Sequence, residues 1–373
     1  MSNVTLACSP VVVDNSYPAK VAKLAAYSSI LAVSLIGNVL IIAVVYKHRH
    51  TGMWTTTNCF IANMAFSDLI IPLFAVPNRI FNLARDASFL WMWSGTGGLI
   101  LCKTLNFLLD VSTAVSILSL VAIASDRYYA VKFPLKAVVS RPTRVCAIVI
   151  PVIWLSAAGF HAIYFYTFRL LEWNHNTYCI LDWQPYTDSM RAQRPFYMCQ
   201  FVLLYAAPLL LIAFLYACVI RKLREGALAT HKPLRRRRSE RSRNRKVTKM
   251  CVVAVLCFVL CWAPIHVYSL YFHFVWGWAA PCGMQELTFL VFFAAYSYAA
   301  INPFIFMIFN EKYRRGVKSL FTAKKILRRQ LSDSSFRSRS SSGFASRLRY
   351  CGSNQSESSR VQSVRNVSWA TGV

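Results

Sequence analysis

Five ionisable side chains within, or at the edge of, long apolar stretches of this sequence are the first candidates for a functional site. Asp68 lies in the middle of one stretch, Asp110 lies in another, and His266 lies in a third. Asp126 and Arg127 are adjacent and close the stretch that contains Asp110. Because ionisable groups in apolar segments cost free energy, they mark functional sites more often than packing positions. Residues of these types can bind a polar ligand or act as a polar switch.

Catalysis is a second chemistry that such residues could carry, but their pattern argues against it. A membrane hydrolase needs a Ser and a His, or two Asp, at one depth, whereas Asp68 and Asp110 lie at different depths. The chain has 12 cysteines, and those within the apolar stretches are irregularly spaced and lack a nearby His. This spacing argues against a metal site. We therefore predict no enzyme, no cofactor and no metal centre.

Seven apolar segments must position these side chains. The chain has 373 residues, 56% of them hydrophobic, and a formal net charge of +28. The segments cover residues 21–46, 53–81, 98–130, 145–168, 195–220, 247–276 and 284–309. Each is at least as long as the ~20 residues that a helix needs to cross ~30 Å of hydrocarbon. We therefore predict an all-α membrane protein, a seven-transmembrane helix bundle.

The excess positive charge lies in four segments that follow the first, third, fifth and seventh apolar stretches. Residues 221–249 and 311–373 each carry a net charge of +11, and residues 126–144 and 47–49 carry +4 and +2. The positive-inside rule predicts that these segments are cytoplasmic and that the N-terminus is extracellular, in the plasma membrane. Charge on this side of a membrane faces anionic lipid. Nucleic acid is therefore not a predicted partner.

Composition divides the chain into four parts. We expect an extracellular tail over 1–20, the bundle over 21–309, an amphipathic helix on the inner leaflet over 310–321, and a disordered cytoplasmic tail over 322–373. The basic run 235–246 predicts a further flexible segment.

The segments predicted to be extracellular contain modification sites. Asn3 begins an Asn-Val-Thr acceptor for glycosylation. Four cysteines lie in or beside these segments: Cys8, Cys102, Cys179 and Cys282. An even number in an oxidising compartment predicts disulfides, and three pairings are open.

Motifs in all seven spans resemble those of the rhodopsin-like (class A) G-protein-coupled receptors. Asp126-Arg127-Tyr128 ends the third span, and Asn302-Pro303 lies in the seventh. Further matches are Gly37-Asn38-Val39, Asn63, Asp68, Pro77, Cys102, Trp154, Cys179, Pro208, Tyr216, Phe258 and Cys261-Trp262-Ala263-Pro264. Each lies in the expected span at the expected depth. The resemblance implies a receptor for an extracellular ligand that activates heterotrimeric G proteins.

The resemblance also implies roles for single residues. Cys102 and Cys179 are expected to form a disulfide, which leaves Cys8 and Cys282 as a second pair. Arg127 is expected to meet the G protein once the inner ends of the helices open. The implied activation switch consists of Asp68, Ile117, Asp126, Arg127, Tyr128, Pro208, Tyr216, Phe258, Trp262, Pro264, Asn302 and Pro303.

Three departures from the family pattern concern activation. Asp68 and Ser116 fit the family's sodium site, but Tyr298 and Ala299 replace its usual Asn and Ser, so we expect Asp68 to act without an ion. Phe306 replaces a tyrosine that stabilises the active state. The start of the sixth span contains no acidic side chain that could pair with Arg127, and the lack of this pair weakens the inactive state. We therefore expect modest constitutive activity.

The ligand is predicted to be a peptide. Where amine receptors of the family carry an Asp, this chain has Leu109, and Asp110 is one position, about 100°, further round the helix. Residues 166–194 resemble the hairpin lid of peptide receptors, and their acidic groups suit a cationic peptide, for example one with an amidated C-terminus. Six side chains are the candidate ligand contacts: Asp110, Thr113, Gln200, His266, Ser269 and Tyr296.

Other functions are also open at this point. A receptor for a small amine-like ligand and a constitutive scaffold without ligand-driven signalling are the alternatives within this fold. A transporter is disfavoured because the sequence has no internal repeat and no path of paired intramembrane charges. The Ser-rich tail predicts receptor kinases and arrestin as partners, in addition to the G protein and the lipid bilayer.

Overall fold

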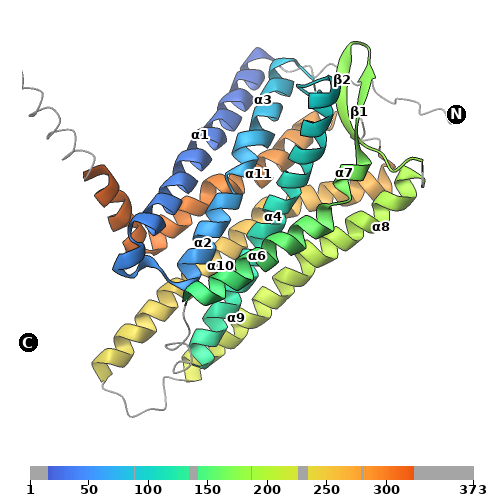
Figure 1. Ribbon diagram of the computed structural model, residues 1–373. Coiled ribbons are helices and arrows are strands. Elements are labelled where there is room, and N and C mark those ends of the chain that lie inside the picture. The colour runs from blue at the N-terminus through green and yellow to red at the C-terminus, as the bar shows by residue number, and fades with distance from the viewer. Residues whose placement is uncertain are drawn as a thin grey trace, which may run out of the picture. The chain divides into compact units, whose positions relative to one another are not determined.

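The computed structural model describes most of the chain (Figure 1). The described residues are 16–87, 89–133, 142–185, 187–225, 234–278, 281 and 283–322, without the side chains of 142, 225, 234–241 and 243. The predictions for Asn3, Cys8, Cys282 and the Ser-rich tail lie outside the described residues.

Within the described residues, seven helices are long and apolar enough to cross a membrane, which confirms the predicted seven-helix bundle. They are Tyr17–Lys47, Thr56–Ala84, Gly95–Lys132, Thr143–Thr167, Ser189–Arg224, Asn244–Val275 and Gln285–Phe309.

Local secondary structure divides several of these spans. The elements are α1 (Tyr17–Lys47), η1 (Arg49–Met53), α2 (Thr56–Ser67), η2 (Ile71–Ala75), α3 (Val76–Ala84), α4 (Gly95–Lys132), α6 (Pro142–His161), α7 (Tyr164–Thr167), β1 (Phe168–Trp173), β2 (Asn176–Leu181), α8 (Ser189–Phe201), η3 (Val202–Ala206), α9 (Ala207–Glu225), α10 (Leu234–Leu270), η4 (Tyr271–Val275) and α11 (Gln285–Phe309). The η elements are π-helical turns.

Two prolines lie next to the π-helical turns. The turn η2 ends just before Pro77, and η3 ends just before Pro208. A proline has no N–H to donate and clashes with the preceding turn, so the helix widens at that point. Pro264 and Pro303 lie inside α10 and α11, which continue through them.

The helix α10 begins earlier than hydropathy predicts. It starts at Leu234, so the run 235–246 is helical, and the prediction of a flexible segment there was wrong. Hydropathy detects only the part of a helix that lies in hydrocarbon. Arg, Lys and Glu are good helix formers, so the helix continues beyond the apolar part.

The hairpin of β1 and β2 lies at one end of the bundle, which we call the hairpin end (Figure 1). The strands pair antiparallel, with Phe168 opposite Leu181 and Trp173 opposite Asn176. Arg127 lies near the C-terminus of α4, at the other end, which we call the Arg127 end.

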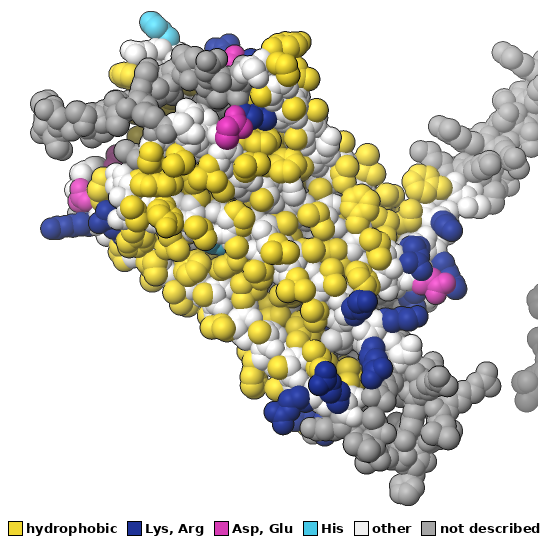
Figure 2. Space-filling model, turned by 180° about the vertical axis from the view of Figure 1, so that it is seen from behind, with side chains coloured by type: hydrophobic (Ala, Val, Ile, Leu, Met, Phe, Trp, Pro, Cys, Tyr) yellow, Lys and Arg dark blue, Asp and Glu magenta, His cyan; other side chains and the backbone are white. Residues whose placement is uncertain are grey.

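Side chains on the outside of the helices suit a lipid environment. Leu155, Leu210 and Leu260 are each 72% exposed on the outside of the helices. So much exposed apolar surface would be unfavourable in water. Figure 2 shows hydrophobic side chains over the middle of one face and Lys and Arg gathered at the end away from the hairpin. Exposed basic residues at the Arg127 end are Arg221, Lys222, Arg224, Lys312, Arg314, Arg315 and Lys318.

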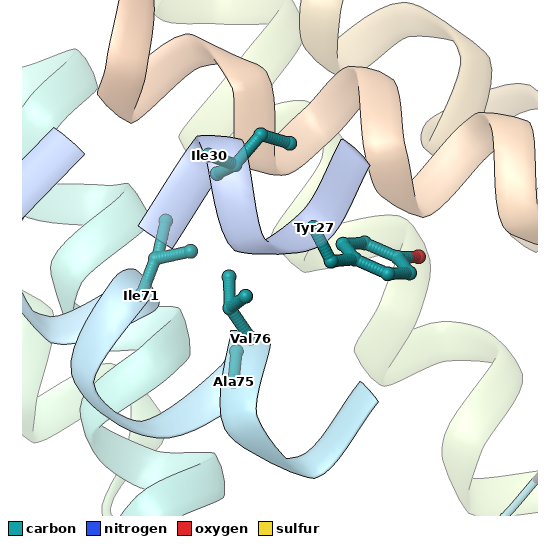
Figure 3. Close-up of a cluster of buried hydrophobic side chains, with 5 residues drawn as sticks. All are labelled: Tyr27, Ile30, Ile71, Ala75 and Val76. Carbon is teal, nitrogen blue, oxygen red and sulfur yellow. The ribbon is translucent and has the colours of Figure 1, made fainter. Parts of the chain in front are cut away.

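A cluster of buried apolar side chains joins the first two spans at the hairpin end (Figure 3). Its members are Tyr27, Ile30, Ile71, Ala75 and Val76, from α1, η2 and α3. Leu109 and Trp262, from the third and sixth spans, pack against it. Of the candidate ligand contacts, Tyr296 packs against this cluster.

Residues 311–322 form a short helix after α11. Tyr313 is fully buried, and its hydroxyl donates to Asn58 Oδ1 over 3.2 Å. Burial raises the pKa of the Tyr313 phenol above its ordinary value, so the side chain stays a neutral donor. Gly316 faces Val44 so closely that an added Cβ would lie 2.4 Å from Val44 Cγ1.

Candidate functional site

Asp110 on α4 is the centre of a polar group at the hairpin end. Its Oδ2 accepts a hydrogen bond from the Tyr164 hydroxyl over 2.5 Å and one from Gln200 Nε2 over 3.4 Å. No basic side chain of the described chain forms an ion pair with it. The half-buried carboxylate therefore has neutral donors but no counter-charge, an arrangement that suits a cationic or donor group of a ligand.

His266 on α10 belongs to a neighbouring aromatic group. The Tyr197 hydroxyl lies 3.2 Å from His266 Nδ1 and donates to the His266 carbonyl over 3.1 Å. The Tyr205 ring lies 4.2 Å from the imidazole, centroid to centroid. Ser269 and Asp110 both lie near the Tyr197 hydroxyl. The structure thus brings four of the six predicted contacts together through Tyr164 and Tyr197.

The other two predicted contacts are less closely joined to this group. Thr113 donates its hydroxyl to the Leu109 carbonyl in its own helix. Tyr296 packs on Phe292, with ring centroids 5.9 Å apart, and against the cluster of Figure 3. Tyr296 therefore lies on the side of the bundle formed by the first, second and seventh spans.

The hairpin is tied down over this region. Cys102 on α4 and Cys179 on β2 form a disulfide with 5.7 Å between their Cα atoms, as the family resemblance implied. Asn106 donates to Cys179 Sγ over 3.2 Å, and the Trp91 amide donates to the Thr177 carbonyl over 2.8 Å. The predicted hairpin lid is therefore present and attached to the third span and to the loop that precedes it.

Two of the acidic groups in this loop have structural roles. Asp182 accepts from Ser189 Oγ over 3.0 Å and lies 3.8 Å from the Arg169 guanidinium. Asp188 caps α8 by accepting from the Arg191 amide over 2.9 Å. These contacts reduce the charge that the hairpin offers a cationic ligand, so Asp110 is the stronger basis for that prediction.

Two residues of the predicted activation switch, Phe258 and Trp262, pack on each other one turn below His266. Phe258 is buried against Trp262, with ring centroids 6.0 Å apart, and meets Tyr298 edge-on at 5.1 Å. Ile117 is also fully buried on α4. Pro208 follows the π-helical turn η3 in the adjacent span. Aromatic packing at these depths can couple movement of α10 to its neighbours.

Asp68 is fully buried and fully hydrogen-bonded. Its Oδ1 accepts from Ser116 Oγ and its Oδ2 accepts from Asn302 Nδ2, each over 2.7 Å. Tyr298 is buried beside this group and directs its hydroxyl to Met64 Sδ, 3.6 Å away, while Ala299 offers no side-chain oxygen. Tyr298 and Ala299 therefore supply neither of the two seventh-span side chains that the family's sodium site uses, and we expect Asp68 to act without the ion. Asn302 Oδ1, which is buried without a hydrogen-bond partner, is a further oxygen from this span.

Arg127 is held by its neighbour at the opposite end. Asp126 Oδ2 accepts from Arg127 Nε over 3.1 Å and also from Arg127 Nη2, and Thr57 Oγ1 donates to the same oxygen over 2.8 Å. Tyr216 on α9 interacts electrostatically with the arginine. Tyr128 instead accepts from Lys132 Nζ over 2.7 Å. Arg127 is therefore held in place by Asp126, a residue of its own helix.

Sequence reasoning missed three side chains at the hairpin end. Tyr164 and Tyr197 link the predicted contacts, but tyrosine is too common in helices to be singled out by type. Arg79 lies inside the second span, with its guanidinium 3.7 Å from the centroid of the Phe292 ring. The rule that marked Asp68, an ionisable residue within an apolar span, applies equally to Arg79 and should have found it.

The bundle, the disulfide-bound lid and the paired arginine at the far end together define a seven-helix membrane receptor. The family model described as "7 transmembrane receptor (rhodopsin family)" matches residues 37–306. The chain belongs to this family, and it is a G-protein-coupled receptor.

Similar proteins include receptors for two peptides. The chain is 28% identical to galanin receptor 2a of Danio rerio over 297 residues, which cover 79% of the chain and 76% of that receptor. It is 30% identical to the substance-P receptor of Rattus norvegicus over 299 residues, which cover 80% of the chain and 70% of that receptor.

Proposed function

We propose that an extracellular peptide activates this receptor and that the activated receptor couples to heterotrimeric G proteins through Arg127. The observation that carries the proposal is the unneutralised Asp110 carboxylate beneath the disulfide-bound hairpin. The relatives named after galanin and substance P support a peptide as the ligand. The chain acts as a receptor and has no enzymatic activity.

The proposed orientation places the hairpin end outside the plasma membrane and the Arg127 end in the cytoplasm. Exposed basic residues gather at the Arg127 end, which is the distribution that the positive-inside rule expects (Figure 2). The same orientation puts the Cys102–Cys179 disulfide in the oxidising compartment. The helix of residues 311–322 then lies at the level of the inner leaflet.

Activation follows from a shift between two bundle arrangements. A ligand favours the arrangement that it binds more tightly, and it shifts the equilibrium only by that difference in affinity. We infer that contacts at Asp110 and His266 move the outer part of α10, which hinges at Pro264. The inner part of α10 then moves away, and Arg127 leaves Asp126 to meet the G protein. Phosphorylation of the Ser-rich tail by receptor kinases then recruits arrestin.

A peptide screen tests this proposal. Cells that express the chain with a promiscuous G protein are exposed to a library of neuropeptides and biogenic amines, and second-messenger output is recorded. We expect a response to a peptide, its loss in Arg127→Ala, and wild-type output from the control variant Arg49→Ala, whose guanidinium stacks on Tyr46 at the same end. Surface labelling confirms that each variant reaches the membrane. A response to amines alone, or full signalling by Arg127→Ala, would contradict the proposal.

A further inference from the structure

Arg79 on α3 is a second charge without a counter-charge at the hairpin end. It lies within the span Thr56–Ala84 and is half-buried. Its guanidinium stacks over the Phe292 ring of α11, 3.7 Å from the centroid. No carboxylate in the described part of the chain forms an ion pair or hydrogen bond with it. Two lysines at this end are instead paired with carboxylates, Lys20 with Asp86 and Lys23 with Glu286.

The aromatic contact leaves the hydrogen-bonding capacity of Arg79 unused. A guanidinium carries five N–H donors in a planar fork. The face of the Phe292 ring attracts the cation but accepts none of these donors in the way that an oxygen does. A charged side chain within a membrane span marks a functional site more often than a packing position, and the half-buried Arg79 is such a side chain.

Two phenols complete the surroundings of Arg79. The Tyr27 side chain lies near both the Arg79 guanidinium and the Tyr296 phenol. Figure 3 shows the Tyr27 hydroxyl pointing away from the aliphatic side chains of its cluster. Tyr296 packs against the same cluster and against Phe292. One planar cation and two hydroxyl donors thus gather on the side formed by α1, α3 and α11.

We propose that Arg79, with Tyr27 and Tyr296, is the subsite that binds the carboxylate of the ligand. A bidentate guanidinium matches the planar, two-oxygen shape of a carboxylate. Since no ion pair joins Arg79 to Asp110, the two charges are free to meet opposite charges on one ligand. The inference rests on the proposed function and deepens it: the peptide presents a cationic or donor group to Asp110 and a carboxylate, favoured to be a free C-terminus, to Arg79.

Matched peptide pairs test this proposal. Each active peptide from the screen is synthesised as the free acid and as the C-terminal amide, and again with its Asp and Glu replaced by Asn and Gln. We expect the free acid to be roughly tenfold to a hundredfold more potent than the amide on the wild-type receptor. Arg79→Gln removes this preference, and Arg79→Lys, which keeps the charge without the fork, retains part of it.

Arg85→Gln is the matched control, because Arg85 follows the same helix and is exposed over its own neighbour Phe81. It should leave the acid preference unchanged. If the preference instead follows the Asp and Glu of the peptide and depends on Arg79, the carboxylate is a side chain and the subsite stands. If Arg79→Gln weakens acid and amide equally, Arg79 has a structural role and the proposal is wrong.

A binding measurement separates this inference from the proposed function. The melting temperature of the purified receptor is recorded with N-acetyl-leucyl-phenylalanine as the acid or as the amide. Stabilisation by the acid that Arg79→Gln abolishes supports the subsite, even if no peptide activates the receptor. Equal effects of the acid and the amide on both proteins contradict it, even if peptides do activate the receptor.

Discussion

The ion pair between Asp126 and Arg127 gives a direct test of what holds the resting state. In the described part of the chain, Asp126 is the only carboxylate paired with Arg127. The start of the transmembrane part of α10 reads Asn244-Arg245-Lys246 and offers no acidic partner. Asp126→Asn removes the charge that holds the arginine, so we expect signalling without ligand to rise.

The size of this effect follows from the burial and bonding of the pair. Both side chains are 19% exposed, so solvent screens the pair less than it screens a surface salt bridge. A hydrogen bond to a charged group contributes about 1.5–3 kcal/mol, and a neutral amide retains part of it. A net loss of about 1–2 kcal/mol raises the ratio of active to resting receptor roughly fivefold to thirtyfold, at 1.4 kcal/mol for each factor of ten.

The assay is ligand-free second-messenger output at matched surface density. Thr57→Val serves as the control, because it removes one hydrogen bond to the same Asp126 oxygen and leaves the charge in place. We expect it to raise output by about fivefold at most, from a loss of ~1 kcal/mol. Output from Asp126→Asn equal to wild type, or below that of Thr57→Val, would refute the reasoning that Asp126 restrains Arg127.

Three further outcomes are expected. Tyr313→Phe leaves the buried Asn58 Oδ1 without its donor and lowers the free energy of unfolding by about 1–3 kcal/mol, seen as a lower melting temperature of the purified receptor. Gly37→Ala places a Cβ 2.7 Å from Pro303 Cγ and forces α1 away from α11. The free energy of unfolding then falls by about 1–3 kcal/mol, and normal surface expression and melting temperature would contradict this. Exchange of sodium for potassium leaves the melting temperature unchanged, because Tyr298 directs its hydroxyl to Met64 and Ala299 has no side-chain oxygen for the ion; sodium-specific stabilisation would contradict this.

Much of the fold could be predicted from the sequence because the bilayer constrains it. The predicted segment 98–130 lies within Gly95–Lys132, and the predicted segment 284–309 nearly coincides with Gln285–Phe309. The thickness of the hydrocarbon layer sets the minimum length of an apolar helix that crosses it, and a run of that length can be counted in the sequence. The extension of α10 back to Leu234 was not visible, because hydropathy carries no signal for a helix that continues into water.

The candidate site was only partly predictable, because pairing depends on positions in space. Asp110 stands out by type alone, but its partners Tyr164 and Gln200 come from two other spans, and no spacing along the chain relates them. The unpaired state of Arg79 is likewise a property of the folded bundle. Glu286, near the start of the seventh span, pairs with the buried Lys23 of the first span, and no spacing along the chain relates the two residues.

Nucleotide exchange on purified components tests the central claim most directly. The receptor in lipid nanodiscs is mixed with heterotrimeric G proteins of each class and the active peptide from the screen, and GTP uptake is followed over time. We predict that the wild-type receptor with peptide accelerates exchange on at least one G protein and that Arg127→Ala does not. Exchange that stays at the rate of G protein alone, or that Arg127→Ala accelerates equally, would contradict a receptor that signals through Arg127.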